Sequence, residues 1–398
     1  MRKRLRLCIA DWICLRVSVV LIFIVRFIAR MGKLARRYKC DQKLVLVYAN
    51  DLLGDTIVKL PFFFSLRKEY PPGQYHIAVV LSPAMAEIIA KLALFDEIIK
   101  EPPLHWRHPI FWLVGRHGIA RSLRWAFSHD VEVMIVCHRS RSLGCDFALR
   151  LCSPFISAAY AADVKTPMLP MTARYQAKVC DRMYDYLLTP MDGRHQMEDM
   201  DRLLSLAVGH HVKSVRPELQ EIVGMLDFSL AKFDFEYVVF VPGARVNYRR
   251  WPITKFIEMA KKLAGNVVVV GTAGESTLAR EIATVEDCNV VDLCGKTTLP
   301  QLGGILARAK LVITNETGTA TYSAMVGAKT VCIVGGGDFG AFFPNQYCKN
   351  AVSVFHMDEC FNCGWNCTKV NLGPSNIAPC VEAVSVEDVF DSVSRIAP

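Results

Sequence analysis

Short apolar runs, each followed by a turn and a stretch of helical periodicity, occur in two series along the chain. This alternation constrains the fold more than any other feature. The first series begins at Lys43–Tyr48 and the second at Tyr237–Val241. Continuous apolar runs of this length are typical of strands buried on both faces, as in a parallel sheet whose crossovers are helices. The pattern therefore predicts an α/β protein with two doubly wound parallel sheets.

The chain has 398 residues, which is long enough for two such domains with full cores. Open α/β sheets bind ligands beyond the carboxyl ends of their strands, so we expect the two Rossmann-like domains to face a cleft. The predicted division is a basic arm at 1–40, an N-terminal domain at 41–180, a helical linker at 181–232, a C-terminal domain at 233–380 and a final helix at 381–398.

The positive charge of the chain is concentrated in its first residues. The net charge is +9, yet residues 1–39 contain eleven Lys and Arg against one acid, Asp11, so the remaining residues sum to −1. A nucleic-acid-binding protein usually carries its basic charge on the folded body, and this distribution excludes that class. Within the arm, Ile13–Ile28 is mostly apolar but contains Arg16 and Arg26. This pattern favours an amphipathic helix lying on an anionic membrane surface, and a single membrane span is the alternative.

The fifteen cysteines are too dispersed in a chain this long to indicate a secreted disulfide scaffold. We expect a reducing compartment, with several thiols buried in strands as small hydrophobic groups. Cys360, Cys363 and Cys367 form a C-x2-C-x3-C run that precedes Cys380. Such a set is compatible with a structural zinc ion, and reduced thiols beneath the final helix, or disulfides in an oxidising setting, are the alternatives.

The stretch Leu311–Met325 reads as a buried strand, a polar turn and a helix of small residues. A turn of this kind directs the free N–H groups of the next helix, and the positive end of its dipole, to one point beyond the sheet. Thr317 and Thr319 add hydroxyl donors, and Gly318 permits close approach of a ligand to the backbone. The stretch therefore predicts a phosphate site, although an ordinary strand–turn–helix connection has the same pattern.

Four stretches in order resemble the family of lipopolysaccharide heptosyltransferases, which are inverting glycosyltransferases of the GT-B architecture. The resemblance covers roughly residues 43–395 at the level of pattern. The stretches are Leu44–Pro71 with Gly54-Asp55 and Leu60-Pro61, Pro242-Gly243-Ala244 followed by Arg249-Arg250-Trp251-Pro252, Leu293–Leu299 leading to Leu302, and Asn315-Glu316-Thr317-Gly318.

The resemblance implies roles for individual residues. It makes Asp55 the base that takes the proton of the acceptor hydroxyl, and Asp51 is the second candidate for this role. The structural alternative for Asp55 is an N-cap of the helix at Thr56–Lys68. Arg249 occupies the position where the family usually has a phosphate-binding Lys, and Arg250 is the second candidate for this contact. The structural alternative for both arginines is a solvated basic turn before Pro252.

The other site predictions concern the donor and the acceptor. The diphosphate-binding turn of the family is matched by Thr317, Gly318 and Thr319. Glu275 occupies the position where a family acid bonds the ribose hydroxyls. The alternative for Glu275 is an exposed residue at a helix start. We also predict that Thr297 belongs to the nucleotide site and that Arg139 and Arg141 bind the acceptor. No acidic pair with metal spacing stands out, so we expect catalysis without a cofactor, apart from the structural zinc considered above.

The resemblance therefore implies a sugar transferase at the cytoplasmic face of the bacterial inner membrane, peripheral or anchored through its N-terminus. Its donor would be a nucleotide diphosphate sugar of the ADP-heptose type, and its acceptor a lipid-linked glycan such as a lipopolysaccharide core. Glu316 stands in place of the usual Asp, and Thr321 in place of a frequent His. These departures leave the donor sugar open and motivate the alternative of a degenerate, non-catalytic glycan- or nucleotide-binding member. A cofactor enzyme is disfavoured because no G-x-G-x-x-G follows the first strand.

Overall fold

The computed structural model describes residues 41–101, 121–138, 141, 143–162, 170–189, 194–373 and 376–397. They form two compact units. Unit 1 comprises the described residues of 41–52, 62–189 and 197–214, and unit 2 those of 53–61, 194–196 and 215–397. The basic arm predicted at 1–40 lies outside the described residues. Within the described ranges, no helix combines the length and apolar character needed to cross a bilayer.

Unit 1 is built on a six-stranded parallel sheet with the order β3-β2-β1-β4-β5-β6. Central strand β1 is apolar on both sides, and Val45, Leu46 and Val47 are fully buried. This double burial explains why β1 is a continuous apolar run instead of an alternating one. The strands are β1 Lys43–Tyr48, β2 Tyr75–Leu81, β3 Glu97–Lys100, β4 Val131–Val136, β5 Ile156–Tyr160 and β6 Tyr186–Leu188.

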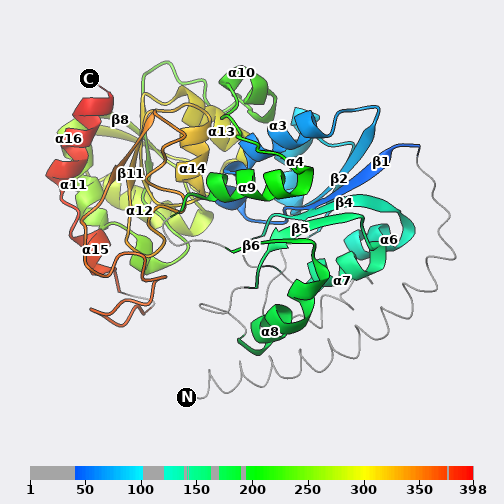
Figure 1. Cartoon of the computed structure of the whole chain (residues 1–398). Coiled ribbons are helices and arrows are strands. Elements are labelled where there is room, and N and C mark those ends of the chain that lie inside the picture. Colours follow the sequence, from blue (N-terminus) through cyan, green and yellow to red (C-terminus); the bar gives the residue numbers. More distant parts are fainter. Residues whose placement is uncertain are drawn as a thin grey trace. The chain divides into compact units, whose positions relative to one another are not determined.

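Helices cover both faces of this sheet. In Figure 1, α3 and α4 lie on one face, and α6 and α7 lie on the other. The strand order reverses direction between β1 and β4, so the crossovers before and after this point fall on opposite faces. The helices of unit 1 are α3 Leu60–Glu69, α4 Pro83–Ile89, α6 Arg121–Ser128, α7 Leu143–Cys152, α8 Pro170–Tyr175 and α9 Gln196–Val208.

Unit 2 repeats the same topology with its own sheet, ordered β12-β11-β10-β7-β8-β9, and all of its strands are parallel. The reversal here lies between β7 and β10. The strands are β7 Val238–Val241, β8 Gly265–Val269, β9 Cys288–Asp292, β10 Leu311–Asn315, β11 Thr330–Ile333 and β12 Ala351–Val354. The helices are α2 Leu53–Ile57, α10 Leu219–Ile222, α11 Ile253–Leu263, α12 Ser276–Ile282, α13 Leu299–Arg308, α14 Gly318–Met325, α15 Pro379–Glu382 and α16 Val386–Ile396.

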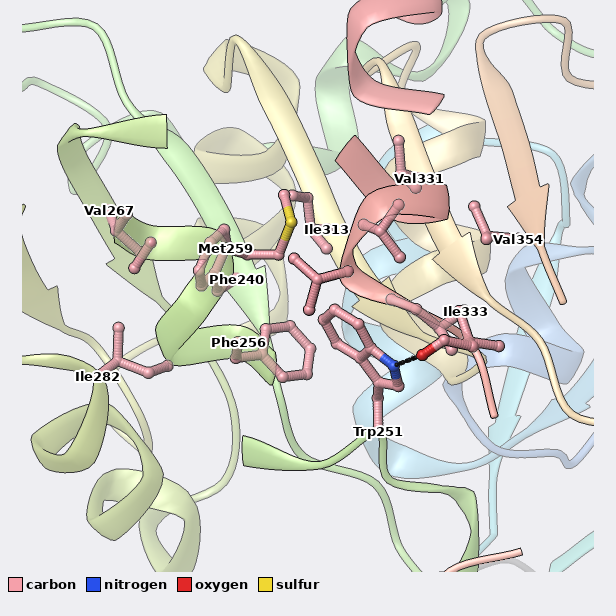
Figure 2. Packing of buried hydrophobic residues seen from close by; sticks show 14 of the residues in the cluster. Phe240, Trp251, Phe256, Met259, Val267, Ile282, Ile313, Val331, Ile333 and Val354 are labelled. Carbon is pink, nitrogen blue, oxygen red and sulfur yellow. Dashed lines mark hydrogen bonds between the residues drawn. The ribbon is translucent and has the colours of Figure 1, made fainter. Parts of the chain in front are cut away.

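Trp251 is the largest fully buried side chain of unit 2, and it joins the C-terminal helices to the sheet. Figure 2 shows its indole beside Phe256 and Ile333, with the indole N–H donating to the carbonyl oxygen of Val384 at 2.9 Å. Helix α16 packs its apolar side into the same core through residues such as Val389. A buried indole needs an acceptor for its N–H, and the Val384 carbonyl supplies it.

The structure differs from the sequence-based expectation in three places. The helical periodicity over Thr56–Lys68 is divided into α2 and α3 because Pro61 has no N–H and its ring clashes with the carbonyl four residues earlier. Part of the segment predicted as a helical linker is strand β6, which pairs with β5. Edge strands β3 and β12 were not expected at all.

Candidate functional site

The site predicted from the sequence lies in unit 2, at the point where its strand order reverses. Neighbouring strands β7 and β10 end there together. The turn Pro242-Gly243-Ala244 follows β7, and Glu316-Thr317-Gly318 follows β10. This reversal point is where doubly wound sheets bind their ligands, because the two loops diverge and leave the strand ends accessible.

Asn315, the last residue of β10, ties three segments of the site together. Its side-chain amide donates to the carbonyl oxygen of Pro242 at 2.8 Å, and its side-chain oxygen accepts the backbone N–H of Trp251 at 2.9 Å. Asn315 is fully buried. It therefore fixes the positions of the turn after β7 and of the Arg249-Arg250 segment relative to the end of β10.

The guanidinium of Arg249 is held between two carboxylates and an aromatic ring. It lies 3.2 Å from Asp338 and 3.8 Å from Glu316, and it stacks 4.6 Å above the ring of Trp365. Both carboxyl contacts are made by the same terminal nitrogen, Nη2, and the face of the guanidinium lies on the Trp365 ring. The Nε atom of Arg249 is buried and has no hydrogen-bond partner in the described part of the chain.

Glu316 is a buried carboxyl group whose pKa is shifted strongly upward. Burial raises the pKa of Glu316 to about 8, the charge of Asp338 adds to the rise, and Arg249 opposes it. Neither carboxyl oxygen has a hydrogen-bond partner among the described residues. The group is therefore protonated at neutral pH when the site is empty, and it adds no negative charge where an anion would bind.

This raised pKa predicts a pH dependence of stability. Between pH 4.5 and about 8, Glu316 is protonated in the folded protein and ionised in the unfolded chain. The folded state then binds more protons, so the free energy of unfolding of the empty protein should decrease as pH rises through this window. Glu316→Gln should make the decrease smaller in urea titrations from pH 5 to 8. Equal slopes in the variant and the wild type would contradict the assignment, and the exposed Glu281→Gln is the matched control.

The N-terminus of α14 adds a further buried polar atom without a described hydrogen-bond partner, beside those of Arg249 and Glu316. Thr317 caps the helix in an extended conformation, and the N–H groups of Ala320 and Thr321 bond back to its carbonyl oxygen. The N–H groups of Gly318 and Thr319 precede this ladder, as expected for a first helical turn. The Thr317 hydroxyl is buried without a hydrogen-bond partner in the described ranges. Buried polar atoms of this kind are rare in native proteins, and a bound water, ion or polar ligand satisfies them.

The structure brings Asp55 to this same helix terminus. Asp55 belongs to α2, which is part of unit 2, and the adjacent Gly54 packs directly on Gly318. A Cβ atom built on Gly54 would lie 2.9 Å from the Gly318 Cα, so only glycine allows this approach. The Gln196 amide lies 3.4 Å from a carboxylate oxygen of Asp55. Asp51 lies in unit 1 instead, where it bonds His138 at 2.9 Å.

Two predicted site residues have local structural partners. Arg250 donates to the carbonyl oxygen of Ala244 and lies 3.4 Å from Glu275. Glu275 accepts the backbone N–H of Thr272 in a capping box, and its carboxylate fills the space beside Gly243. Glu275 thus lies at a helix start, as the alternative to a ribose contact expected, but it is buried and not exposed, at 9%. Thr297 is half-buried, one residue before the N-cap of α13.

Arg141, one of the two predicted acceptor residues, is held by partners within unit 1. Its side chain is fully buried within unit 1, at 2.8 Å from Asp146 and 2.5 Å from Asp181, and it also donates to the carbonyl oxygen of Tyr160. A buried charge requires partners of this kind, and they hold the Arg141 guanidinium in place within the unit. Arg139, the other predicted acceptor residue, lies outside the described residues.

The four C-terminal cysteines line one pocket in unit 2, together with Trp365. None of the four forms a disulfide in the structure. Burial raises the pKa values of Cys363 and Cys380. Among the described residues, no three His, Cys, Asp or Glu side chains are arranged to hold a metal ion. The zinc site at these four cysteines therefore remains a prediction.

Sequence reasoning missed several residues of the site. Asn315 and Trp251 were within the quoted stretches, but a buried Asn at a strand end gives no sequence signal of its three-way contact. Asp338 and Trp365 were not considered as partners of Arg249, because they lie far along the chain from it. Gln196 falls in a segment that the sequence pattern assigned to a linker.

A model of glycosyltransferase family 9 (heptosyltransferase) matches residues 141–366, which is more than half of the chain. No curated protein matches the chain.

Three solved structures are similar to the chain over nearly their whole length. They are ADP-heptose lipopolysaccharide heptosyltransferase II of E. coli (14% identity, TM-score 0.61, 89% of this chain and 98% of that one), heptosyltransferase WaaC of E. coli with ADP (17%, 0.62, 89% and 100%), and the family 9 glycosyltransferase of Veillonella parvula (16%, 0.63, 91% and 99%). At these identities the likeness concerns the fold. It confirms the expectation of a GT-B-like α/β protein with two parallel sheets.

Proposed function

Because the chain belongs to glycosyltransferase family 9, we propose that it transfers a heptose or related sugar from a nucleotide diphosphate sugar to a lipid-linked glycan, with inversion at the anomeric carbon. The observation that carries this proposal is the convergence of Asp55, Arg249 and the first turn of α14 within unit 2. Two solved relatives are described with an ADP-heptose name or with ADP bound, and both have the same fold.

The chemistry follows from the three groups. The Asp55 carboxylate takes the proton of the acceptor hydroxyl while the hydroxyl oxygen forms a bond to the anomeric carbon. The bond between that carbon and the diphosphate oxygen breaks, and the nucleoside diphosphate leaves with the electron pair. Arg249 and the N–H groups at Gly318 and Thr319 stabilise the charge that develops on the leaving group. The Thr317 hydroxyl supplies a further donor.

The acceptor and the location of the enzyme belong to the same proposal. The acceptor is a lipopolysaccharide core or a related surface glycan, and the basic arm at 1–40 holds the enzyme on the anionic cytoplasmic surface of the inner membrane. The concentration of charge in the arm, against a nearly neutral remainder, supports this placement.

A thermal-shift panel of nucleotide diphosphate sugars tests the function directly. A ligand that binds the folded state alone raises the unfolding temperature with its concentration, and we expect ADP-heptose or a close relative to do so most. Transfer to a lipid-linked acceptor is then measured with that donor. Binding without turnover would favour the degenerate, non-catalytic alternative, for which Glu316 and Thr321 are the motivating departures. Absence of protection by every sugar nucleotide would contradict the proposed function.

Arg249→Ala tests the phosphate contact. Loss of a charge-assisted hydrogen bond to phosphate should weaken ADP binding by about tenfold to a hundredfold. Isothermal calorimetry with ADP measures the effect. The exposed Arg280→Ala, on α12 of the same unit, controls for the change in net charge. Equal affinities of the Arg249 variant and the wild type would remove Arg249 from the donor site.

A further inference from the structure

Arg249 owes its position to a segment more than a hundred residues further along the chain. The indole N–H of Trp365 donates to the Asp338 carboxylate at 2.7 Å, and the same carboxylate oxygen binds Arg249 at 3.2 Å. The Trp365 ring also lies directly under the Arg249 guanidinium, at 4.6 Å. Trp365 therefore acts on Arg249 twice, through its ring face and through the carboxylate that both residues share.

The segment that carries Trp365 is fixed on the sheet. Asn362 N–H bonds the carbonyl oxygen of Gly336 at 2.6 Å, and Gly364 N–H bonds that of Gly337 at 2.9 Å. A Cβ atom on Gly337 would collide with the Trp365 indole, so the ring lies flat against the backbone that follows β11. The ring cannot leave this position without breaking these contacts.

The backbone of Trp365 shows the same constraint. Its φ is +62°, in the left-handed region that bulky residues rarely adopt. A residue remains in that region only where its surroundings determine it. Here those surroundings are the glycine backbone below the ring, Asp338 at its edge and Arg249 above it.

We propose that Trp365, together with Asp338, is a positioning residue for donor binding that holds the Arg249 guanidinium toward the diphosphate at the first turn of α14. The inference rests on the proposed function, because it assigns Arg249 to that diphosphate. Arg side chains have many rotamers, so a guanidinium that is fixed in advance loses less conformational entropy when it binds phosphate. The Arg249 side chain keeps 27% of its surface exposed, so the positioned guanidinium remains accessible to a ligand.

Calorimetry with ADP on the full-length protein tests the proposal through a double-mutant cycle. Trp365→Ala should weaken ADP binding by about tenfold in the wild-type background. In the Arg249→Ala background the same change should alter affinity by less than about twofold, because Trp365 has no guanidinium left to position. Trp365→Phe, which keeps a ring face but loses the bond to Asp338, should fall between Trp365→Ala and the wild type.

A matched control separates positioning from damage to the segment. Phe361 packs on Gly336 within the same segment, and its ring contacts are with Phe339 and Phe355. Phe361→Leu should therefore leave ADP affinity unchanged, even if it lowers the unfolding temperature. Additive losses in the double-mutant cycle would overturn the positioning role while leaving the proposed function intact. Wild-type protein that binds no nucleoside diphosphate would overturn both.

Discussion

Asp55→Asn is expected to lower kcat for sugar transfer by about a thousandfold, while ADP affinity stays within about a factor of two of wild type. Removal of a general base typically costs between about a hundredfold and ten-thousandfold, and the amide cannot accept the proton of the acceptor hydroxyl. The amide preserves the size of the side chain and can still bond Gln196. Steady-state transfer assays and calorimetry measure the two quantities separately.

Asp51→Asn is the matched control for this substitution. Asp51 is the other acid of the same turn, and its partner is His138 in unit 1. The asparagine oxygen can still accept the bond from the imidazole, so we expect a change in kcat of less than about tenfold. If the Asp51 variant were the inactive one and the Asp55 variant were active, the role of base would belong to Asp51.

Gly318→Ala should reduce kcat/KM for transfer by about a hundredfold. A Cβ atom at Gly318 would lie 2.8 Å from the backbone nitrogen of Gly54, and no rotamer change relieves a contact between two backbones. Helix α2 must then move away from α14 and take Asp55 with it. A displacement of about 1 Å at a reacting group is enough for a loss of this size.

Two further variants decide whether the loss reflects this contact. Gly54→Ala strains the same approach from the other side, with its Cβ 2.9 Å from the Gly318 Cα, and should have a comparable effect on transfer. Gly373→Ala adds a Cβ atom in open space and should behave as wild type. Full activity in either of the first two variants would show that the close packing of α2 on α14 is unnecessary for catalysis.

The central strands could be predicted from the sequence because they are buried on both faces. Strands β1, β7 and β10 are mostly or wholly apolar, and their alternation with helices predicts the parallel topology. The resemblance to heptosyltransferases, which added the GT-B architecture, is confirmed by the family match. The edge strands β3, β6 and β12 were missed because most of their residues are partly exposed, so the burial that marks the central strands is lacking.

The site was predicted unevenly for a related reason. Short-range signals, such as a glycine turn after a strand, predicted Thr317 and Gly318 as phosphate ligands, and the family resemblance added Asp55. The environment of Glu316 depends on burial by residues distant in sequence, so its raised pKa had no local signal. The same holds for Arg141, because its partners Asp146 and Asp181 appear in the sequence as ordinary acids.

A crystal structure of the protein with ADP would test the central claim most directly. The account predicts that the diphosphate oxygens accept hydrogen bonds from the Gly318 and Thr319 N–H groups and from the Arg249 guanidinium. It also predicts that the terminal phosphate faces Asp55. A diphosphate bound away from the first turn of α14, or bound there with Asp55 directed away from it, would contradict the account.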